Sequence, residues 1–310
     1  MTATQRHSQN APSIVCLGHA ALDRIYRIAA FPPTPRKLAA LGMEEVGGGM
    51  AANAAVAAAR LGADVAFCGR VGDDLAGQEI RDGLRREGID TAQLRAFPGG
   101  ASSTSAVIVD AGGERLLVNH RGSGLAEDAG WLDVGIVRTA RVVLADVRWP
   151  QGALALFRAA RAAGAPTVLD ADFGAGAALL ALLAETDYAL FSAPGLAEFS
   201  ADDRQAALAQ VRSLGPIHAG VTQGAHGYLW LDEKGAHRLP AFDVVVIDTS
   251  GAGDAFHGGF VWALARGQDI AACVTSAQAV AALKCGQIGN RAGLPDAAAL
   301  RAFLARNVAG

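Results

Sequence analysis

Short runs of β-branched and aliphatic residues alternate along this chain with longer segments of helical periodicity. The runs expected to form strands are residues 13–17, 64–68, 141–144, 166–169, 188–191 and 217–222, and the helical segments are 50–61, 76–87, 152–163, 204–214, 252–265 and 270–283. Strict alternation of strand and helix is typical of a mostly parallel sheet with helices on both faces. The sequence therefore predicts a three-layer α/β fold whose ligands bind at the carboxyl ends of the strands.

Two regions interrupt this alternation and predict a small additional sheet. Residues 24–46 contain the stretch FPPTP, which a buried parallel strand would not tolerate. Residues 103–110 and 114–119 alternate in polarity around Ala111-Gly112-Gly113, as in an antiparallel hairpin. We therefore expect residues 13–23, 47–100 and 120–310 to form one α/β domain. Residues 24–46 and 101–119 would form a small β lid, and residues 1–12 a disordered tail.

The overall composition argues against several classes of function. The 310 residues carry a net charge of −3, which gives no sign of the basic surface that binds nucleic acids or anionic membranes. No apolar run is long enough to span a bilayer, and residues 1–12 lack the apolar core of a secretion signal. The four scattered cysteines (Cys16, Cys68, Cys273 and Cys285) are expected to be buried, reduced thiols. We therefore expect a cytoplasmic protein that binds neither nucleic acid nor membranes.

The most informative segment is DTSGAGDAFHGG, residues 248–259, which follows an apolar run at 244–247 that we expect to be a strand. Small residues at 251–253 would let main-chain N–H groups converge at the start of a helix, where they and the helix dipole bind anions. Asp254 stands beside this cradle, where a carboxylate can accept the proton of an attacking hydroxyl. Taken alone, the pattern fits equally well a tight turn before an acidic first helical turn. The complete segment favours phosphoryl transfer.

A second glycine-rich segment lies near the N-terminus. It reads GGGMAANAA at 47–55 and continues through ARLG at 59–62 to GRVGDD at 69–74. Together the two segments resemble the two signatures of the ribokinase-like (PfkB) family of carbohydrate kinases, and the resemblance extends over residues 14–304. It implies a ribokinase-like three-layer fold with a mostly parallel central sheet and a small β-strand lid. It also implies an ATP-dependent kinase that transfers the γ-phosphate to a sugar hydroxyl.

The resemblance assigns roles to the residues of both segments. Asp254 would be the general base, and Gly251, Ala252 and Gly253 would form the anion hole. The sugar would be bound by Asp23, Gly48, Gly49 and Asn53. A carboxylate such as Asp23 can accept two hydroxyl hydrogen bonds at once, although it could instead pair with its neighbour Arg24. Asn53 offers both a donor and an acceptor, and helix capping is the alternative role at this position.

The nucleotide and metal sites are less clearly marked. Thr222 and Gly224 lie in a turn that resembles the one the family uses for ATP, and residues 281–290 are expected to border the adenine. The family's Asn-x-x-Glu motif, associated with Mg²⁺, is absent from the matching residues 192–195, so the ATP phosphates and water would supply most magnesium ligands. Asp248 and Ser250 match the family's loop for a monovalent cation, which suggests K⁺.

Within the family, several stretches resemble the 6-deoxy-6-sulfofructose kinases, among them VLADVRW at 143–149 and RAGLPD at 291–296. In those enzymes a Lys, an Asn and an Arg hold the sulfonate, and Lys37, Asn119 and Arg148 stand at the matching places. Such a set suits a tetrahedral oxyanion. Lys37 could also be a solvated loop cation, and Arg148 could pair with a nearby aspartate. Asn53 matches the neutral-sugar ribokinases, so a neutral ketose or pentose stays open.

Two further expectations concern the type of protein and its assembly. The principal hypothesis is an enzyme that phosphorylates a ketose hydroxyl, whether the ketose is anionic or neutral. A protein of the same fold that senses sugar or nucleotide without catalysis is the alternative, and the intact cradle argues against it. The lid strands would expose an apolar face if they projected alone, so we expect a homodimer formed through the lid.

Overall fold

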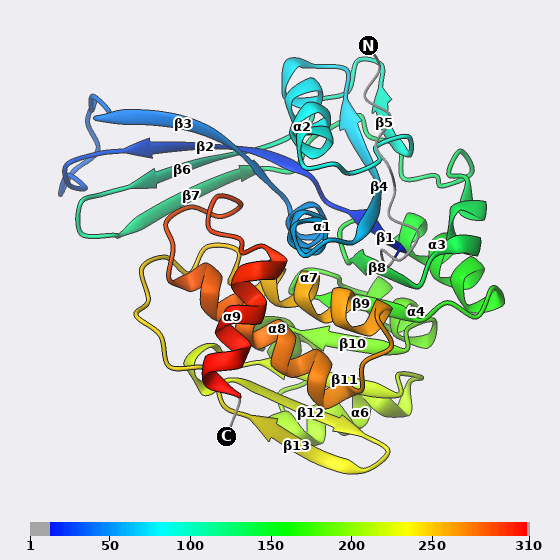
Figure 1. Ribbon diagram of the computed structural model, residues 1–310. Helices are drawn as coiled ribbons and strands as arrows, with labels where there is room; N and C mark the ends of the chain where they lie inside the picture. The colour runs from blue at the N-terminus through cyan, green and yellow to red at the C-terminus, as the bar shows by residue number, and fades with distance from the viewer. Residues whose placement is uncertain (1–12, 309–310) are drawn as a thin grey trace.

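A computed structural model describes residues 13–308 and arranges them around two sheets (Figure 1). The larger sheet has nine strands in the order β13-β12-β11-β10-β9-β8-β1-β4-β5. Neighbouring strands are parallel except at β11–β12 and β12–β13, which are antiparallel. Its strands are β1 (Ser13–Gly18), β4 (Asp64–Gly72), β5 (Leu94–Phe97), β8 (Val142–Asp146), β9 (Thr167–Ala171), β10 (Tyr188–Phe191), β11 (His218–Thr222), β12 (Tyr228–Asp232) and β13 (Gly235–Leu239). The tail expected at residues 1–12 lies outside the described residues.

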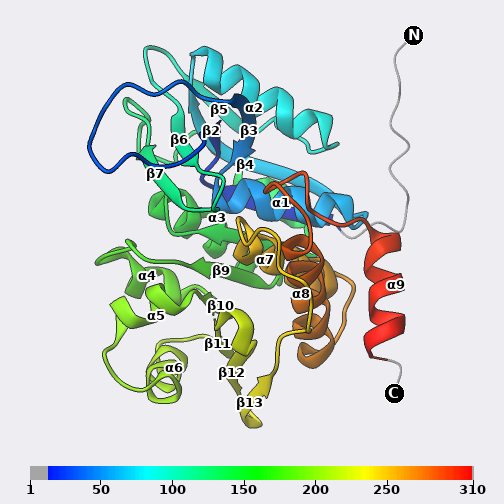
Figure 2. The ribbon, with the colours of Figure 1, turned by 90° about the vertical axis from the view of Figure 1, so that its left-hand side faces the viewer.

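Helices cover both faces of this sheet, so that the predicted three-layer α/β fold is confirmed (Figure 2). One face packs against α1 (Met50–Arg60), α2 (Leu75–Arg86), α7 (Ala252–Ala265), α8 (Ile270–Cys285) and α9 (Ala297–Asn307), and the other against α3 (Pro150–Ala162), α4 (Ala178–Ala184), α5 (Ala193–Phe199) and α6 (Arg204–Ser213). A hydrophobic core lies on each face of the sheet, and alternate residues of a central strand point into the two cores. Ile14 belongs to one core and Val15 to the other. Within residues 13–308, no helix combines the length and apolarity needed to cross a membrane.

The smaller sheet is the lid, and it projects from the larger sheet (Figure 1). Its strands are β2 (Ala21–Arg27), β3 (Gly42–Gly48), β6 (Ser103–Val109) and β7 (Arg115–His120), in the order β3-β2-β6-β7. The expected hairpin is formed by β6 and β7, which pair antiparallel, whereas β2 and β6 run parallel. Asp23, which the sequence placed at the end of the large domain, lies in lid strand β2.

The apolar run at 244–247 is not a strand, contrary to expectation. Val245 is 82% exposed, and the main-chain N–H groups of Ile247 and Asp248 donate to the carbonyl of Cys285 at 2.8 and 3.1 Å. The edge of the sheet next to β11 is taken by the β12–β13 hairpin, so the run has no strand to pair with. Apolar character alone does not distinguish a buried strand from an apolar loop.

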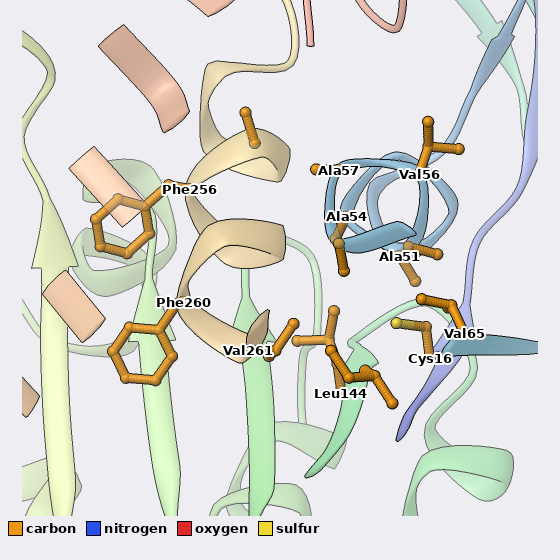
Figure 3. Packing of buried hydrophobic residues seen from close by; sticks show 14 of the residues in the cluster. Cys16, Ala51, Ala54, Val56, Ala57, Val65, Leu144, Phe256, Phe260 and Val261 are labelled. Carbon is orange, nitrogen blue, oxygen red and sulfur yellow. The ribbon is translucent and has the colours of Figure 1, made fainter. Parts of the chain in front are cut away.

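Helices α1 and α7 pack closely because their facing residues are small (Figure 3). Ala51, Ala54 and Ala57 are fully buried, and Val261 of α7 packs into the same core. A side chain at Gly258 of α7 would collide with Ala57 of α1. The close approach brings the first turns of both helices to the same edge of the sheet, where they carry Asn53 and Asp254.

Candidate active site at the start of helix α7

Consecutive residues at the start of helix α7 line two different cavities. Asp254 lines the first cavity, of about 540 Å³, whereas Ala252 and Gly253 line the second, of about 500 Å³. Gly251 precedes the helix with a φ of 70°, a left-handed conformation that favours glycine, and a side chain there would collide with the Asn290 amide. The first turn of α7 is therefore shared by both cavities.

The first cavity lies between the lid and the carboxyl ends of the strands of the large sheet. Several residues predicted to bind the sugar line it together with Asp254: Asp23, Gly49, Asn53, Asn119 and Arg148. Lys37 does not join them, because it is exposed in the loop that connects β2 to β3. Gly48 does not line the cavity either, but a side chain there would collide with the Asp23 carboxylate, so its role is to leave room for that group.

The second cavity contains both residues predicted to bind the nucleotide, Thr222 and Gly224. Ala281, Ala282 and Cys285 of α8 also line it, as expected for the residues bordering an adenine. The expectation was wrong for Asn290, which lines the first cavity instead. The chain turns after α8, so the end of the helix and the loop that follows it face different cavities.

Asp254 is partly buried and lies close to other carboxylates. Its Oδ2 accepts a hydrogen bond of 2.7 Å from Asn53 Nδ2. Burial, followed by repulsion from Asp170, raises the pKa of Asp254 to about 7. His257 is buried, with its Nδ1 3.3 Å from Asp170 Oδ2. Burial disfavours its charged form, but the Asp170 carboxylate outweighs this and raises the pKa of His257. The site therefore holds a carboxylate that titrates near neutral pH.

Arg291 positions Asn53 and was not identified as a site residue from the sequence. Its Nε donates to Asn53 Oδ1 at 2.8 Å, and its Nη2 donates to the Gly48 carbonyl at 3.0 Å. Because the Asn53 oxygen accepts from Arg291, its amide nitrogen is oriented to donate to Asp254. Asn53 thus links a buried guanidinium to the candidate base. The only sequence signal was the position of Arg291 within the RAGLPD stretch.

Asp23 is available to a ligand in the first cavity. The alternative partner Arg24 instead donates to Glu45 Oε1 at 2.7 Å, across the exposed side of the lid. Burial raises the pKa of Asp23, a shift that Ser105 and Arg291 partly oppose. A partly buried carboxylate that lines a cavity suits a polyhydroxylated ligand.

Two guanidinium groups lie at one wall of the first cavity. Arg148 Nη2 contacts Asp172 Oδ2 at 3.3 Å, as the sequence allowed, but its Nη1 is buried and has no hydrogen-bond partner among the described residues. Arg121, which was not predicted from the sequence, lines the same cavity. A Cβ at Gly174 would lie 2.8 Å from Arg148 Nη1 and 3.7 Å from Arg121 Nη2. Burial and these two cations lower the pKa of the adjacent His19 to about 4.

Asp248 and Ser250, the residues predicted for a monovalent cation, line neither cavity. Arg115 of the lid donates to the Asp248 carboxylate at 2.7 Å and also to the Ser250 hydroxyl. Lys284 Nζ donates to the Asp248 carbonyl at 2.6 Å. Two cationic side chains therefore contact the atoms that were expected to hold K⁺.

The raised pKa of Asp254 predicts that Asp254→Asn stabilises the protein at neutral and higher pH. In the wild type, the native state binds the Asp254 proton more tightly than the unfolded state. The contribution of protonated Asp254 to the stability of the wild type is therefore lost as pH rises from about 4 to about 7. The amide cannot ionise, yet its oxygen can still accept from Asn53. We expect a gain in the free energy of unfolding on the order of 1–3 kcal/mol at pH 8 and little gain at pH 4.

Urea unfolding of both proteins across this pH range measures the effect. Asp82→Asn, on the exposed face of α2, is the matched control and should show no pH-dependent gain. A gain for Asp254→Asn that is the same at pH 4 and pH 8 would show that Asp254 does not titrate in this range.

Comparison with known proteins assigns this chain to a family. A family model described as pfkB family carbohydrate kinase matches residues 11–297. The ATP-dependent ribose-1-phosphate kinase of Halopiger xanaduensis is 29% identical over 297 residues, covering 94% of this chain and 97% of that protein. The fructokinase of Vibrio alginolyticus is 30% identical over 285 residues, covering 83% and 91%. A crystal structure provisionally assigned as a ribokinase from Agrobacterium tumefaciens superposes with a TM-score of 0.89, at 33% identity, over 96% of this chain and 100% of that one.

The family match spans nearly all of the described residues and includes both glycine-rich segments. The fold agrees with it, since the superposition extends over 96% of this chain. The chain therefore belongs to the pfkB family of carbohydrate kinases, enzymes that transfer a phosphoryl group to an alcohol.

Proposed function

We propose that the protein is an ATP-dependent sugar kinase in which Asp254 removes the proton from a sugar hydroxyl. The observation that carries this proposal is the sharing of one helical turn by two cavities. Asp254 faces the cavity lined by Asp23 and Asn119, and Gly253 faces the cavity lined by Thr222. A sugar in the first cavity and ATP in the second would therefore present their reacting groups to the start of α7.

The first turn of α7 supplies both the base and the donors for the transferring phosphoryl group. The Ala252 N–H donates to the Thr249 carbonyl at 3.2 Å, which leaves the N–H groups of Gly251 and Gly253 as the main candidates for the anion hole. They act together with the positive end of the helix dipole. Asp254, with a pKa of about 7, is largely ionised at slightly alkaline pH and can then accept the hydroxyl proton.

Magnesium would accompany the nucleotide rather than rest on a protein cage. Residues 13–308 contain no group of three or more His, Cys, Asp or Glu side chains placed to hold a metal ion. At the position of the missing Asn-x-x-Glu motif, Ser192 caps α5 and donates to Asp172 at 2.6 Å. Mg²⁺ bound through the ATP phosphates and water would neutralise part of the phosphate charge.

The relatives favour a ribose or fructose type of substrate. Their names refer to ribose 1-phosphate, fructose and ribose, and none of the three refers to sulfofructose. Asp23 and Asn119 lie in a cavity large enough for such a sugar and offer it hydrogen bonds. A ribokinase or fructokinase activity is therefore the principal proposal for the substrate.

A sugar that carries an anion, such as 6-deoxy-6-sulfofructose, is a second candidate that the arginines favour. Arg121 and Arg148 line the cavity, and Arg148 Nη1 has no partner there within the described residues. A buried guanidinium nitrogen without a partner is costly, and an oxyanion would satisfy it. Asn119 Nδ2 donates to Ser105 at 3.1 Å and keeps a second hydrogen for the ligand.

Asp254→Asn is expected to lower kcat by about 10³-fold and to leave the Kd for sugar and ATP within a few-fold, because the variant loses the base but keeps the shape of the site. For the wild type, kcat/KM should rise with pH through about 7, as Asp254 loses its proton. ADP release across a panel of sugars measures both. Similar rates for the wild type and Asp254→Asn would remove Asp254 from the mechanism. Binding without turnover for every sugar would favour a sensor.

Arg121→Ala and Arg148→Ala separate the two substrate candidates. If the sugar is anionic, each change should raise its KM by about 10- to 100-fold, because a charge-assisted hydrogen bond is lost. The KM for neutral fructose or ribose should change little. Arg158→Ala is the control, because it removes only an exposed ion pair with Glu185, and Arg158 lies in α3 on the face of the large sheet opposite α7. Unchanged preference between sulfofructose, fructose 6-phosphate and fructose in both variants would count against the anionic substrate.

We also propose that two chains pair through their lids. Met43 in β3 and Leu116, Leu117 and Val118 in β7 are all more than half exposed. Sedimentation equilibrium is expected to give twice the chain mass for the wild type, and a smaller mass for the double variant Leu116→Asp, Val118→Asp. Leu117 is left unchanged because it lines the sugar cavity. A wild-type chain that sediments as a monomer at micromolar concentration would refute the pairing.

A further inference from the structure

A buried lysine holds the loop that leads into the anion cradle. Lys284 lies in the last turn of α8, and its side chain is 0% exposed. Its Nζ donates to the Asp248 carbonyl at 2.6 Å and lies 3.7 Å from Asp248 Oδ2. The main chain adds to this junction, because the Cys285 carbonyl accepts from the N–H groups of Ile247 and Asp248. The end of α8 is thereby fixed to the segment three residues before Gly251.

The remaining oxygens of this loop are also occupied by donors. Asp248 Oδ1 accepts from the Ser250 N–H at 2.9 Å and from Arg115 Nη2 at 2.7 Å, and Oδ2 accepts from the Gly289 N–H at 2.9 Å. The Ser250 hydroxyl contacts Arg115 as well. Burial opposes ionisation of Asp248, but these donors outweigh it and hold its pKa well below the usual range. Residues Asp248 and Ser250 therefore do not fit a further monovalent cation, which would need the same oxygens.

We propose that the Lys284 ammonium is the resident cation of this loop and that the proposed kinase reaction requires no monovalent metal ion. An ammonium carries one positive charge and binds carbonyl and carboxylate oxygens, as a monovalent cation does. Unlike a free ion, it is tethered to α8 and cannot exchange. The inference rests on the proposed function only for its effect on catalysis, since the occupancy of the loop is a property of the protein alone.

Lys284 acts here as a positioning residue. Its contacts reach Asp248, in a different segment from α8, so its role goes beyond stabilising the carbonyls at the end of its own helix. Asp248 precedes the glycines of the cradle, and a shift of its carbonyl would move the N–H groups that face the nucleotide cavity. Arg115 is 39% exposed and belongs to the lid, so it supports the loop from the solvent side. Lys284 alone is enclosed by protein.

Two substitutions of Lys284 differ in the space that they leave. Lys284→Ala removes the charge and opens a hole beside Asp248, which K⁺ can enter. Lys284→Met removes the charge but fills the hole. Both should lower the melting temperature, because the Asp248 oxygens lose their cation. Lys234→Ala, in the exposed turn between β12 and β13, is the matched control and should behave as the wild type.

Thermal melting without sugar or ATP tests cation binding separately from catalysis. Each protein is melted in choline chloride and in KCl at equal ionic strength. The wild type and Lys284→Met should melt at the same temperature in both salts, whereas KCl should raise the melting temperature of Lys284→Ala by at least about 3 °C. A K⁺-specific rise for the wild type would overturn the proposal. So would equal responses of Lys284→Ala and Lys284→Met.

Kinase assays in the same buffers extend the test to the reaction. Wild-type kcat should differ by less than about twofold between choline and KCl, while Lys284→Ala should lose about tenfold in choline and recover most of it in KCl or NH₄Cl. Strong K⁺ stimulation of the wild type would refute the proposal even if every melting curve agreed with it. If no sugar is phosphorylated, the proposed function fails, and the melting curves still decide whether Lys284 occupies the cation site.

Discussion

The partial burial of the Asp254 carboxylate is the constraint on which the rest of the site depends. The general base proposed here must be able to ionise, and ionisation is costly in surroundings that already contain Asp170 and Asp146. Asn53 offsets part of this cost by donating to Asp254 at 2.7 Å, and Arg291 fixes the orientation of that amide. The positive end of α7 adds to the stabilisation. The balance of these terms gives a pKa near neutrality, where a carboxylate is a stronger base than an exposed aspartate.

The register of the parallel sheet explains why carboxylates gather beside Asp254. Asp146 of β8 and Asp170 of β9 are paired in register near the carboxyl ends of their strands. Asp146 also has a structural task, since its carboxylate accepts from the N–H groups of His19, Ala51 and Arg148. It thus joins the end of β1, the first turn of α1 and the loop after β8, three segments that line or support the first cavity. The same carboxylate that shapes the cavity therefore also makes ionisation of Asp254 harder.

The position of Asp254 and of residues 251–253 at the start of one helix was predictable from the sequence, because they lie in one continuous segment. The layers and most elements of the fold were predictable for a similar reason, as periodicity is a local property. Contacts between distant segments were not: Arg291 is 238 residues from Asn53, and nothing near Arg121 or Asn290 indicates that they line the first cavity. The burial of Lys284 was not predictable either, because it depends on where the loop at 247–248 packs. The strand prediction at 244–247 failed for the same reason, because tertiary structure decides whether a sheet edge is open to another strand.

The charges around the first cavity affect how well the enzyme can distinguish anionic sugars from neutral ones. Carboxylates of Asp23 and Asp254 and guanidinium groups of Arg121 and Arg148 line the same space. An anionic substituent would be repelled from the carboxylates and attracted to the arginines, so it would bind in one orientation, with a hydroxyl left for Asp254. A neutral sugar would gain no such orientation and would leave Arg148 Nη1 without a partner. Sites that leave a buried polar group unpaired with the wrong ligand discriminate more strongly than sites that differ only in shape. Discrimination between anionic and neutral sugars would therefore depend mainly on hydrogen bonding to Arg148 and only secondarily on the size of the cavity.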